Sequence, residues 1–384
     1  MIGATLPKIV SITGSLPPLV GMNMPGGETD DNSTPVPGTS GTNYLFAGAT
    51  EYNYAASNGA NYFNINFSWT QLTTTLGGTI GSGSTATYLT NLKNSVTAAL
   101  ATGAYVSIRC APTAANYGGV YCGYITSAPS NVQPKCVGQS GGATDAQFAS
   151  LWSQLAVIFK DQQRVIFDLC NEPNNNTTSA QTAALWFSAA QAAITAIRAT
   201  GSTNTIFVEG VGYSAAVDWL SNNSSYASSI TDPIAGGTVV CVHDYWDGST
   251  GDGGFNTDIS TNAAPTVGNN NVGVLHLTTT NETGSAGTGV LNWAQTNNLK
   301  LFIGEMGCAY NATIGNATTA CTNYYNEIAA NQKNIIGIAW WVFGSSFYQN
   351  AGQPYYQYPT SGPPFTTPSP NLANWQIFLP LKAG

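Results

Sequence analysis

Short apolar runs of strand length alternate along the chain with segments in which apolar residues recur at helical spacing. The clearest helical pattern covers residues 180–200, is rich in Ala and is followed by Gly201. Further helical patterns cover residues 44–58, 87–102 and 145–161. The strand-like runs cover residues 19–24, 61–69, 104–110, 165–172, 205–209, 239–245, 301–305 and 335–341. Strands that alternate with helices are parallel, and this number of them favours a closed (β/α)8 barrel over an open sheet.

One domain is expected from residue 1 to residue 384. The length lies within the range of a single barrel of this kind, and no change of composition marks a second domain or a linked binding module. Residues 359–384 are expected to form a loop and a last segment that packs back on the barrel.

Two of the strand-like runs end in the glutamates Glu172 and Glu305. The first ends in Asn171-Glu172 before a Pro that cannot extend a sheet, and the second places Glu305 between two Gly. In a (β/α)8 barrel the active site lies at the carboxyl ends of the strands. The residues expected there are Asn23, Trp69, Asn171, Glu172, His243, Tyr245, Glu305 and Trp341.

This set of side chains is suited to a sugar. Glycosidic cleavage needs one carboxyl group that stays protonated and one that is ionised. Indole faces stack on pyranose rings, and amides bond hydroxyls. The alternatives are a surface or capping role for each Glu, which is unusual at the end of an apolar strand, and a core role for His243. Trp340 and Trp341 point to opposite sides of their strand, and Trp341 is the one assigned to the site.

Composition excludes several partners. Only 7% of residues are charged, and ten Lys and Arg against eighteen Asp and Glu give a net charge of −8. This balance argues against nucleic acid and anionic membranes, and no apolar run is long enough to span a bilayer. With two His and no CxxC or HExxH motif, neither a metal nor a cofactor is expected.

Seven cysteines suggest local disulfides. Cys122 with Cys136 and Cys308 with Cys321 each bracket a loop, whereas the remaining three lie in strand-like runs and are expected to be buried. These pairs, several Asn-X-Ser/Thr triplets and the low charge favour a secreted, extracellular protein over a cytosolic one. The first residues show no signal peptide, so a leader is expected to be missing from this sequence.

Five segments together resemble the strand motifs of glycoside hydrolase family five, in particular its fungal-type endoglucanase branch. Their order and spacing match over most of residues 19–345. The segments are Ile166-Phe167-Asp168-Leu169-Cys170-Asn171-Glu172-Pro173, Ile206-Phe207-Val208-Glu209-Gly210, His243-Asp244-Tyr245-Trp246-Asp247-Gly248, Phe302-Ile303-Gly304-Glu305-Met306-Gly307 and Ile336-Gly337-Ile338-Ala339-Trp340-Trp341.

The resemblance implies a retaining hydrolase. Glu172 would then be the general acid/base and Glu305 the nucleophile, with their carboxyl groups about 5 to 5.5 Å apart. Asn171 would bond the sugar 2-hydroxyl. His243, Tyr245 and Trp341 would line the cleavage subsite, with Tyr245 near Glu305.

Two departures from the family pattern stand out. The second strand lacks the family's Arg, and Asn64 is the nearest match. The third strand lacks the family's Asp and His, for which Asn116-Tyr117 is a candidate remnant. We hypothesise that Arg109, on the third strand, has taken over the missing Arg's contact with Glu305. The alternative is an ordinary Arg that points outward to a helix.

These observations predict a secreted, monomeric endo-β-1,4-glucanase that acts on a β-linked polysaccharide or oligosaccharide. A mannanase or another β-glycanase is the alternative within the same chemistry. A carbohydrate-binding barrel of weakened activity is the alternative from another class, suggested by the missing Arg and His.

Overall fold

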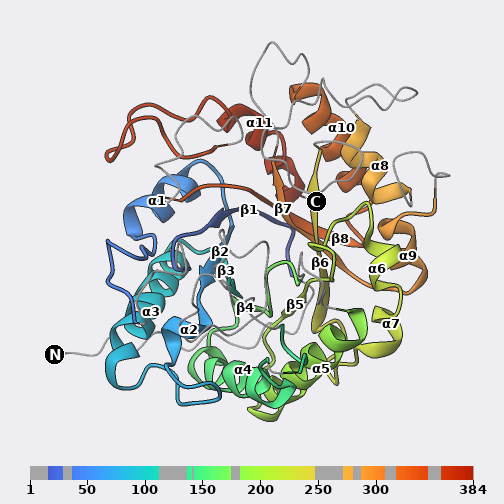
Figure 1. Cartoon of the computed structure of the whole chain (residues 1–384). Coiled ribbons are helices and arrows are strands. Elements are labelled where there is room, and N and C mark those ends of the chain that lie inside the picture. The colour runs from blue at the N-terminus through green and yellow to red at the C-terminus, as the bar shows by residue number, and fades with distance from the viewer. Residues whose placement is uncertain are drawn as a thin grey trace.

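The computed structural model describes residues 16–28, 37–111, 136–140, 142–173, 182–246, 271–279, 287–307, 317–344 and 356–383. Eight parallel strands form a closed barrel in sequence order, with β1 paired to β8 (Figure 1). The predicted (β/α)8 barrel is therefore confirmed. The strands are β1 (Leu19–Met24), β2 (Tyr62–Phe67), β3 (Tyr105–Cys110), β4 (Val165–Asp168), β5 (Ile206–Val208), β6 (Thr238–Tyr245), β7 (Leu301–Gly307) and β8 (Ile335–Trp340).

Helices surround the barrel on its outer side (Figure 1). The longest are α3, α4 and α5, whose apolar stripes were visible in the sequence. The helices are α1 (Ala49–Ser57), α2 (Trp69–Leu72), α3 (Ala86–Ala101), α4 (Asp145–Phe159), α5 (Ala183–Ala199), α6 (Trp219–Asn223), α7 (Tyr226–Ser229), α8 (Val272–Thr278), α9 (Val290–Thr296), α10 (Ala317–Ala330) and α11 (Leu372–Gln376), with 3-10 turns η1 (Gly83–Thr85) and η5 (Leu379–Ala383).

Three predicted boundaries move for local reasons. Helix α1 starts at Ala49 rather than residue 44, because the Gly48 backbone N–H donates to Glu51 Oε2 at 3.1 Å and caps the helix there. Strand β4 ends at Asp168 rather than residue 172, and Glu172 lies beyond it with a positive φ of 45°. Trp69 does not end a strand. It begins α2 and is buried with its ring centroid 5.9 Å from that of Phe148, so its predicted place in the site is wrong.

Aromatic rings fill the lower part of the barrel interior. Tyr62 and Phe302 have ring centroids 4.8 Å apart, and Phe207 stacks on Phe302 at 4.7 Å. Leu19, Ile166 and other buried residues complete this cluster. The barrel is therefore closed by side chains below the carboxyl ends of its strands.

The C-terminal segment packs back on the barrel, as predicted. Trp375 of α11 is buried and donates from Nε1 to the Gly21 carbonyl of β1 at 3.3 Å. Among the helices in the described part of the chain, none combines the length and apolar character needed to cross a bilayer.

Cys110, Cys170 and Cys241 are buried, as predicted. Cys136 and Cys321 are buried as well. Their predicted partners, Cys122 and Cys308, lie outside the described residues, so both disulfides remain predictions.

Candidate active site

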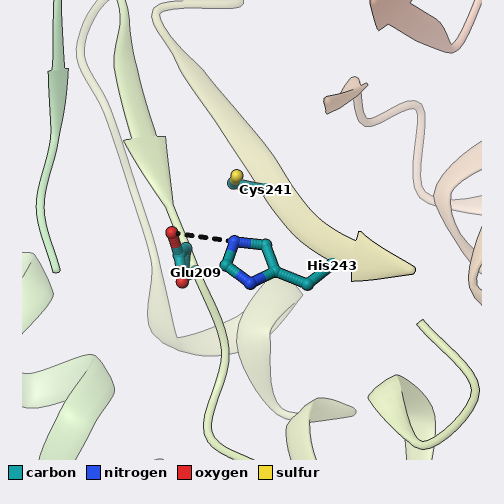
Figure 2. A group of neighbouring side chains, drawn as sticks. All are labelled: Glu209, Cys241 and His243. Atoms are coloured by element: carbon teal, nitrogen blue, oxygen red, sulfur yellow. Dashed lines mark ion pairs between the residues drawn. The ribbon is translucent and has the colours of Figure 1, made fainter. Parts of the chain in front are cut away.

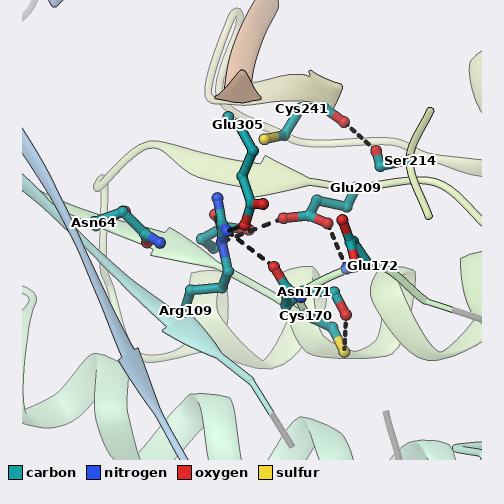
Figure 3. A network of polar contacts seen from close by, with 12 residues as sticks. Asn64, Arg109, Cys170, Asn171, Glu172, Glu209, Ser214, Cys241 and Glu305 are labelled. Atoms are coloured by element: carbon teal, nitrogen blue, oxygen red, sulfur yellow. Dashed lines mark hydrogen bonds and ion pairs between the residues drawn. The ribbon is translucent and has the colours of Figure 1, made fainter. Parts of the chain in front are cut away.

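A polar layer lies above the aromatic rings inside the barrel, and strand alternation builds it. On β3, Tyr105, Ser107 and Arg109 share one side of the strand, so an Arg two residues beyond Ser107 also faces inward. The same alternation carries β4 from Ile166 to Asp168 and β6 from Cys241 to His243. Figure 3 shows the resulting network of buried charged groups.

Glu172 and Glu305 meet in this layer. A carboxylate oxygen of each and a ring nitrogen of His243 all lie within 4.8 Å of one another. The Glu172 side chain is 16% exposed and that of Glu305 is 4% exposed. Two glutamates far apart in the sequence thus form a facing pair, and Glu172 is the more accessible of the two.

Both oxygens of Glu305 are held by donors from other strands. Arg109 Nη1 donates to Oε1 at 2.5 Å, and the Tyr245 hydroxyl donates to Oε2 at 2.6 Å. His243 Nδ1 lies 3.8 Å from Oε2. These contacts fix the plane of the Glu305 carboxylate and compensate its charge.

Arg109 is fully buried and spans several acids. Its Nε lies 2.7 Å from Asp168 Oδ2 and 3.2 Å from Glu209 Oε1, and its Nη1 also donates to Asn171 Oδ1 at 2.9 Å. Burial alone would lower the pKa of Arg109, but Asp168, Glu209 and Glu305 raise it well above its usual value. The guanidinium therefore stays charged. Arg109 points into the barrel and not outward to a helix.

Gly304 makes room for this arrangement. A Cβ at Gly304 would lie 2.3 Å from Cys241 Sγ, 3.1 Å from Arg109 Nη2 and 3.4 Å from His243 Nε2. Real Cβ atoms do not approach sulfur so closely. The Gly before the strand-ending Glu305 therefore has a steric reason, as its position in the sequence suggested.

His243 joins Glu172 to the network. Its Nδ1 lies 2.7 Å from Glu172 Oε1 and its Nε2 3.2 Å from Glu209 Oε1. Burial lowers the pKa of His243, but Glu209 and Glu305 outweigh it and raise the pKa well above 6.5. For Glu172, burial raises the pKa to about 7 against the opposing effect of His243. A carboxyl group that holds its proton near neutral pH is suited to general acid catalysis.

Glu209 is the main residue of this layer that was not predicted as a site residue. It is fully buried, follows β5, and contacts Arg109, His243 and the backbone N–H of Glu172, which donates to Oε2 at 2.5 Å. Burial raises its pKa, but His243 and Arg109 more than compensate and the net pKa is lowered. The available signal was alternation, since Phe207 and Glu209 share one side of their strand.

The remaining predicted residues lie close by. Asn171 is held through Oδ1 by Arg109, which can only donate, so its NH₂ group is the end offered to an acceptor. Trp341 directly follows β8. Its neighbour Trp340 faces outward, where its ring centroid lies 6.5 Å from that of Phe378. Asn116-Tyr117 lies outside the described residues.

Asn64 is fully buried in a chain of neutral groups. Its Nδ2 donates to Asn23 Oδ1 at 2.8 Å and to Asn66 Oδ1 at 2.9 Å, and its Oδ1 accepts from Ser107 Oγ at 2.6 Å. Asn23 in turn donates to the Gly304 carbonyl at 2.9 Å. The amide of Asn64 therefore braces the barrel wall, and the contact with Glu305 comes from Arg109.

Two sets of donor atoms are close enough together to hold a metal. They are Glu209, Cys241 and His243, shown in Figure 2, and Glu172, His243 and Glu305. In the first set, burial raises the pKa of the Cys241 thiol to about 12, whereas a metal binds the thiolate. Arg109 also lies 3.2 Å from Glu209, where it would repel a cation. The chemistry of the donors in this first set does not fit a resident metal.

The chain matches the family model Cellulase (glycosyl hydrolase family 5) over residues 22–346. It is 32% identical over 236 residues to Manganese dependent endoglucanase Eg5A of Phanerodontia chrysosporium, a match that covers 61% of this chain and only 54% of that protein, about half its length. It is 30% identical over 326 residues to Endoglucanase gh5-1 of Neurospora crassa, covering 84% and 69% of the two chains. The structure of XacCel5A in complex with cellopentaose superposes with a TM-score of 0.72 at 27% identity, covering 94% of this chain and 99% of that one. Since the family model extends from within β1 to beyond β8, the chain belongs to glycosyl hydrolase family 5, the cellulase family.

Proposed function

We propose that this protein is a retaining endo-β-1,4-glucanase that hydrolyses internal β-1,4-glycosidic bonds by double displacement. The observation that carries the proposal is the pair Glu172 and Glu305, whose carboxylate oxygens approach within 4.8 Å. Retaining glycosidases place their two carboxyl groups about 5 to 5.5 Å apart, whereas inverting enzymes leave about 6.5 to 9.5 Å for a water molecule.

In the first step Glu305 attacks the anomeric carbon and the bond to the leaving oxygen breaks. Glu172 donates its proton to that oxygen, which leaves as the hydroxyl of the released chain end. The raised pKa of Glu172, about 7, keeps this proton available at neutral and acidic pH. Arg109 and Tyr245 each hold one oxygen of Glu305, which aims the carboxylate.

In the second step water replaces Glu305 at the same carbon. Glu172, now ionised, takes a proton from the water, the oxygen bonds to the sugar, and Glu305 leaves as a carboxylate. Two inversions restore the starting configuration. Asn171 would bond the sugar 2-hydroxyl and Trp341 would stack on the ring at the cleavage point.

The role of Arg109 is the departure from the family pattern that we propose is functional. Arg109 replaces, from β3, the charge that the family's second-strand Arg supplies. This role is supported by the 2.5 Å contact of Arg109 with Glu305. Further contacts with Asp168, Glu209 and Asn171 fix the orientation of the guanidinium. The same contacts argue against a barrel that only binds carbohydrate, because the nucleophile's counter-charge is still present.

The choice of glucan rests on the comparisons. The relatives named above are endoglucanases, and the XacCel5A structure holds cellopentaose. A mannanase or another β-glycanase would use the same two carboxylates, because the outer subsites decide the sugar. We also propose a secreted monomer in which residues 1–384 form one catalytic domain, supported by the continuous fit of the family model and the packed C-terminal segment.

A substrate panel tests the proposal. Carboxymethylcellulose, mannan and xylan are incubated with the enzyme and with Glu172→Gln and Glu305→Gln as matched controls of unchanged size. We expect the wild-type enzyme to hydrolyse carboxymethylcellulose and both control variants to lose this activity. Proton NMR of the first-formed anomer should show retention of configuration. Faster hydrolysis of mannan or xylan would reassign the substrate, and no hydrolysis of any would favour the binding barrel.

A further inference from the structure

We propose that Glu209 is a positioning residue for the reaction, which holds His243 as an imidazolium and through it holds the acid/base Glu172 in place. The inference rests on the proposed function, since it assigns Glu172 the proton-transfer role. Glu209 itself is fully buried, so it acts through its neighbours rather than on the sugar.

Glu209 reaches Glu172 by two routes. Its Oε2 accepts the backbone N–H of Glu172 at 2.5 Å, at the residue whose φ is 45°. Its Oε1 lies 3.2 Å from His243 Nε2, and the opposite ring nitrogen, Nδ1, lies 2.7 Å from Glu172 Oε1. One carboxylate thus fixes both the backbone and the carboxyl end of the acid/base residue.

The groups that face this pair come from several elements. They are Arg109 of β3, Asp168 of β4, Cys241 of β6 and Glu305 of β7. Figure 3 shows Arg109, Cys241 and Glu305 around Glu209. Arg109 Nε is 2.7 Å from Asp168 but 3.2 Å from Glu209, so its closer partner is Asp168. The charge on Glu209 is balanced first by His243 and then by Arg109.

An imidazolium carries a proton on both ring nitrogens, so its charge faces Glu209 from Nε2 while Nδ1 contacts Glu172. A neutral ring would leave the buried Glu209 without the cation that does most to lower its pKa. Because the imidazolium of His243 already carries both of its protons, it orients the acid without taking the proton that goes to the leaving oxygen.

Titration of His243 is the first test. The chain has only two His, so imidazole signals in NMR are assigned with a His276→Gln variant. In the wild-type protein we expect His243 to remain protonated above neutral pH, and in Glu209→Gln we expect its pKa to fall by about one unit or more. A neutral His243 at pH 7 in the wild-type protein would overturn the proposal, and this measurement needs neither substrate nor a variant at Glu209.

Dependence on the leaving group is the second test. Dinitrophenyl β-cellobioside needs no acid to expel its phenolate, whereas cellopentaose does. For Glu209→Gln we expect kcat/KM to fall about 100-fold on cellopentaose and less than about tenfold on the dinitrophenyl substrate, because general acid catalysis contributes on that scale. Equal losses on both substrates would mean that Glu209 supports only the fold or the nucleophile.

Asp168→Asn is the matched control, since it also removes one buried carboxylate bound to Arg109 but leaves in place the ion pair of Glu209 with His243 and its bond with the backbone of Glu172. It should leave the pKa of His243 near that of the wild type. It should lower kcat/KM by a similar factor on both substrates. If Glu209→Gln does not fold, Glu209→Asp keeps the charge and should show the same dependence on the leaving group to a smaller extent. Wild-type protein that cleaves neither substrate would sink the proposed function alone, because the titration stands without turnover.

Discussion

Arg109 Nη1 lies 2.5 Å from Glu305 Oε1, a contact that crosses the barrel interior from β3 to β7. The counter-charge of the proposed nucleophile therefore comes from a strand other than the one that supplies it in the family pattern. The place of the missing Arg on β2 is taken by a chain of amides around Asn64. The buried cation beside Glu305 is thus kept, but it is supplied by β3 in place of β2.

Replacement of Arg109 should show that its shape matters as well as its charge. Arg109→Lys keeps a cation but cannot bond Asp168, Asn171 and Glu305 together, so we expect kcat/KM to fall about 100-fold. Arg109→Ala should in addition lose about 3 to 5 kcal/mol of unfolding free energy, because buried acids lose their partner. Kinetics and urea unfolding measure the two effects, and unchanged kcat/KM in a folded Arg109→Ala protein would refute the assigned role.

Tyr245→Phe should separate positioning from folding. It removes the hydroxyl that donates to Glu305 Oε2 at 2.6 Å and keeps the ring. Hydrogen bonds to charged groups contribute about 1.5 to 3 kcal/mol, so we expect kcat to fall about tenfold or more with little change in KM. Steady-state kinetics on cellopentaose measure this. A rise in KM alone would instead assign Tyr245 to sugar binding.

The pH dependence of activity should follow Glu172. Burial raises its pKa from 4.5 to about 7, so the proton-donating form prevails below that pH. We expect kcat/KM on cellopentaose to decline as the pH rises through about 7, with no such decline on dinitrophenyl β-cellobioside. Profiles recorded with both substrates test this, and a decline centred near 4.5 would contradict it.

Stability should carry the same signature. Because the folded-state pKa of Glu172 lies above the unfolded value of 4.5, its contribution is fully present below 4.5 and is lost as the pH rises through about 7. Glu172→Gln is neutral at every pH and loses no such contribution. Its unfolding free energy should therefore rise relative to that of the wild type as the pH increases from 4.5 to about 7. Denaturant unfolding at several pH values measures the difference, and a constant difference would argue against the raised pKa.

The packing at Gly304 can be tested with a pair of variants. Gly304→Ala should cost about 1 to 3 kcal/mol, because its Cβ would lie 2.3 Å from Cys241 Sγ. Cys241→Ala removes that sulfur, so the double variant should be more stable than Gly304→Ala alone. Thermal unfolding of the four proteins of this cycle gives the coupling energy. Additive effects would mean that the clash is relieved elsewhere.

The sequence was enough to predict the barrel and the order of its strands, because each strand is an apolar run bounded by turn residues. It was also enough to suggest that Arg109 faces inward, since an Arg is present on the third strand where the second strand lacks the family's Arg. The partners of Arg109 could not be deduced in the same way, because they come from distant strands that only closure of the barrel brings together. Trp69 was misplaced because Ser68 ends the extended backbone and a helix starts at once.

Glu209 shows where reasoning from strand ends falls short. It follows β5 as Glu172 follows β4, but it has no exposed surface. The quoted motif contained it, yet nothing in one sequence distinguishes a carboxylate that meets substrate from one that meets an imidazole. The difference lies in depth along the barrel axis, which depends on the stagger of the strands.

The packed rings of Tyr62, Phe207 and Phe302 give the polar layer a solid floor. Within the described part of the chain they leave no tunnel along the barrel axis. The polysaccharide that we propose as substrate would therefore lie crosswise over the mouth, with both of its ends outside, and be cut within its length.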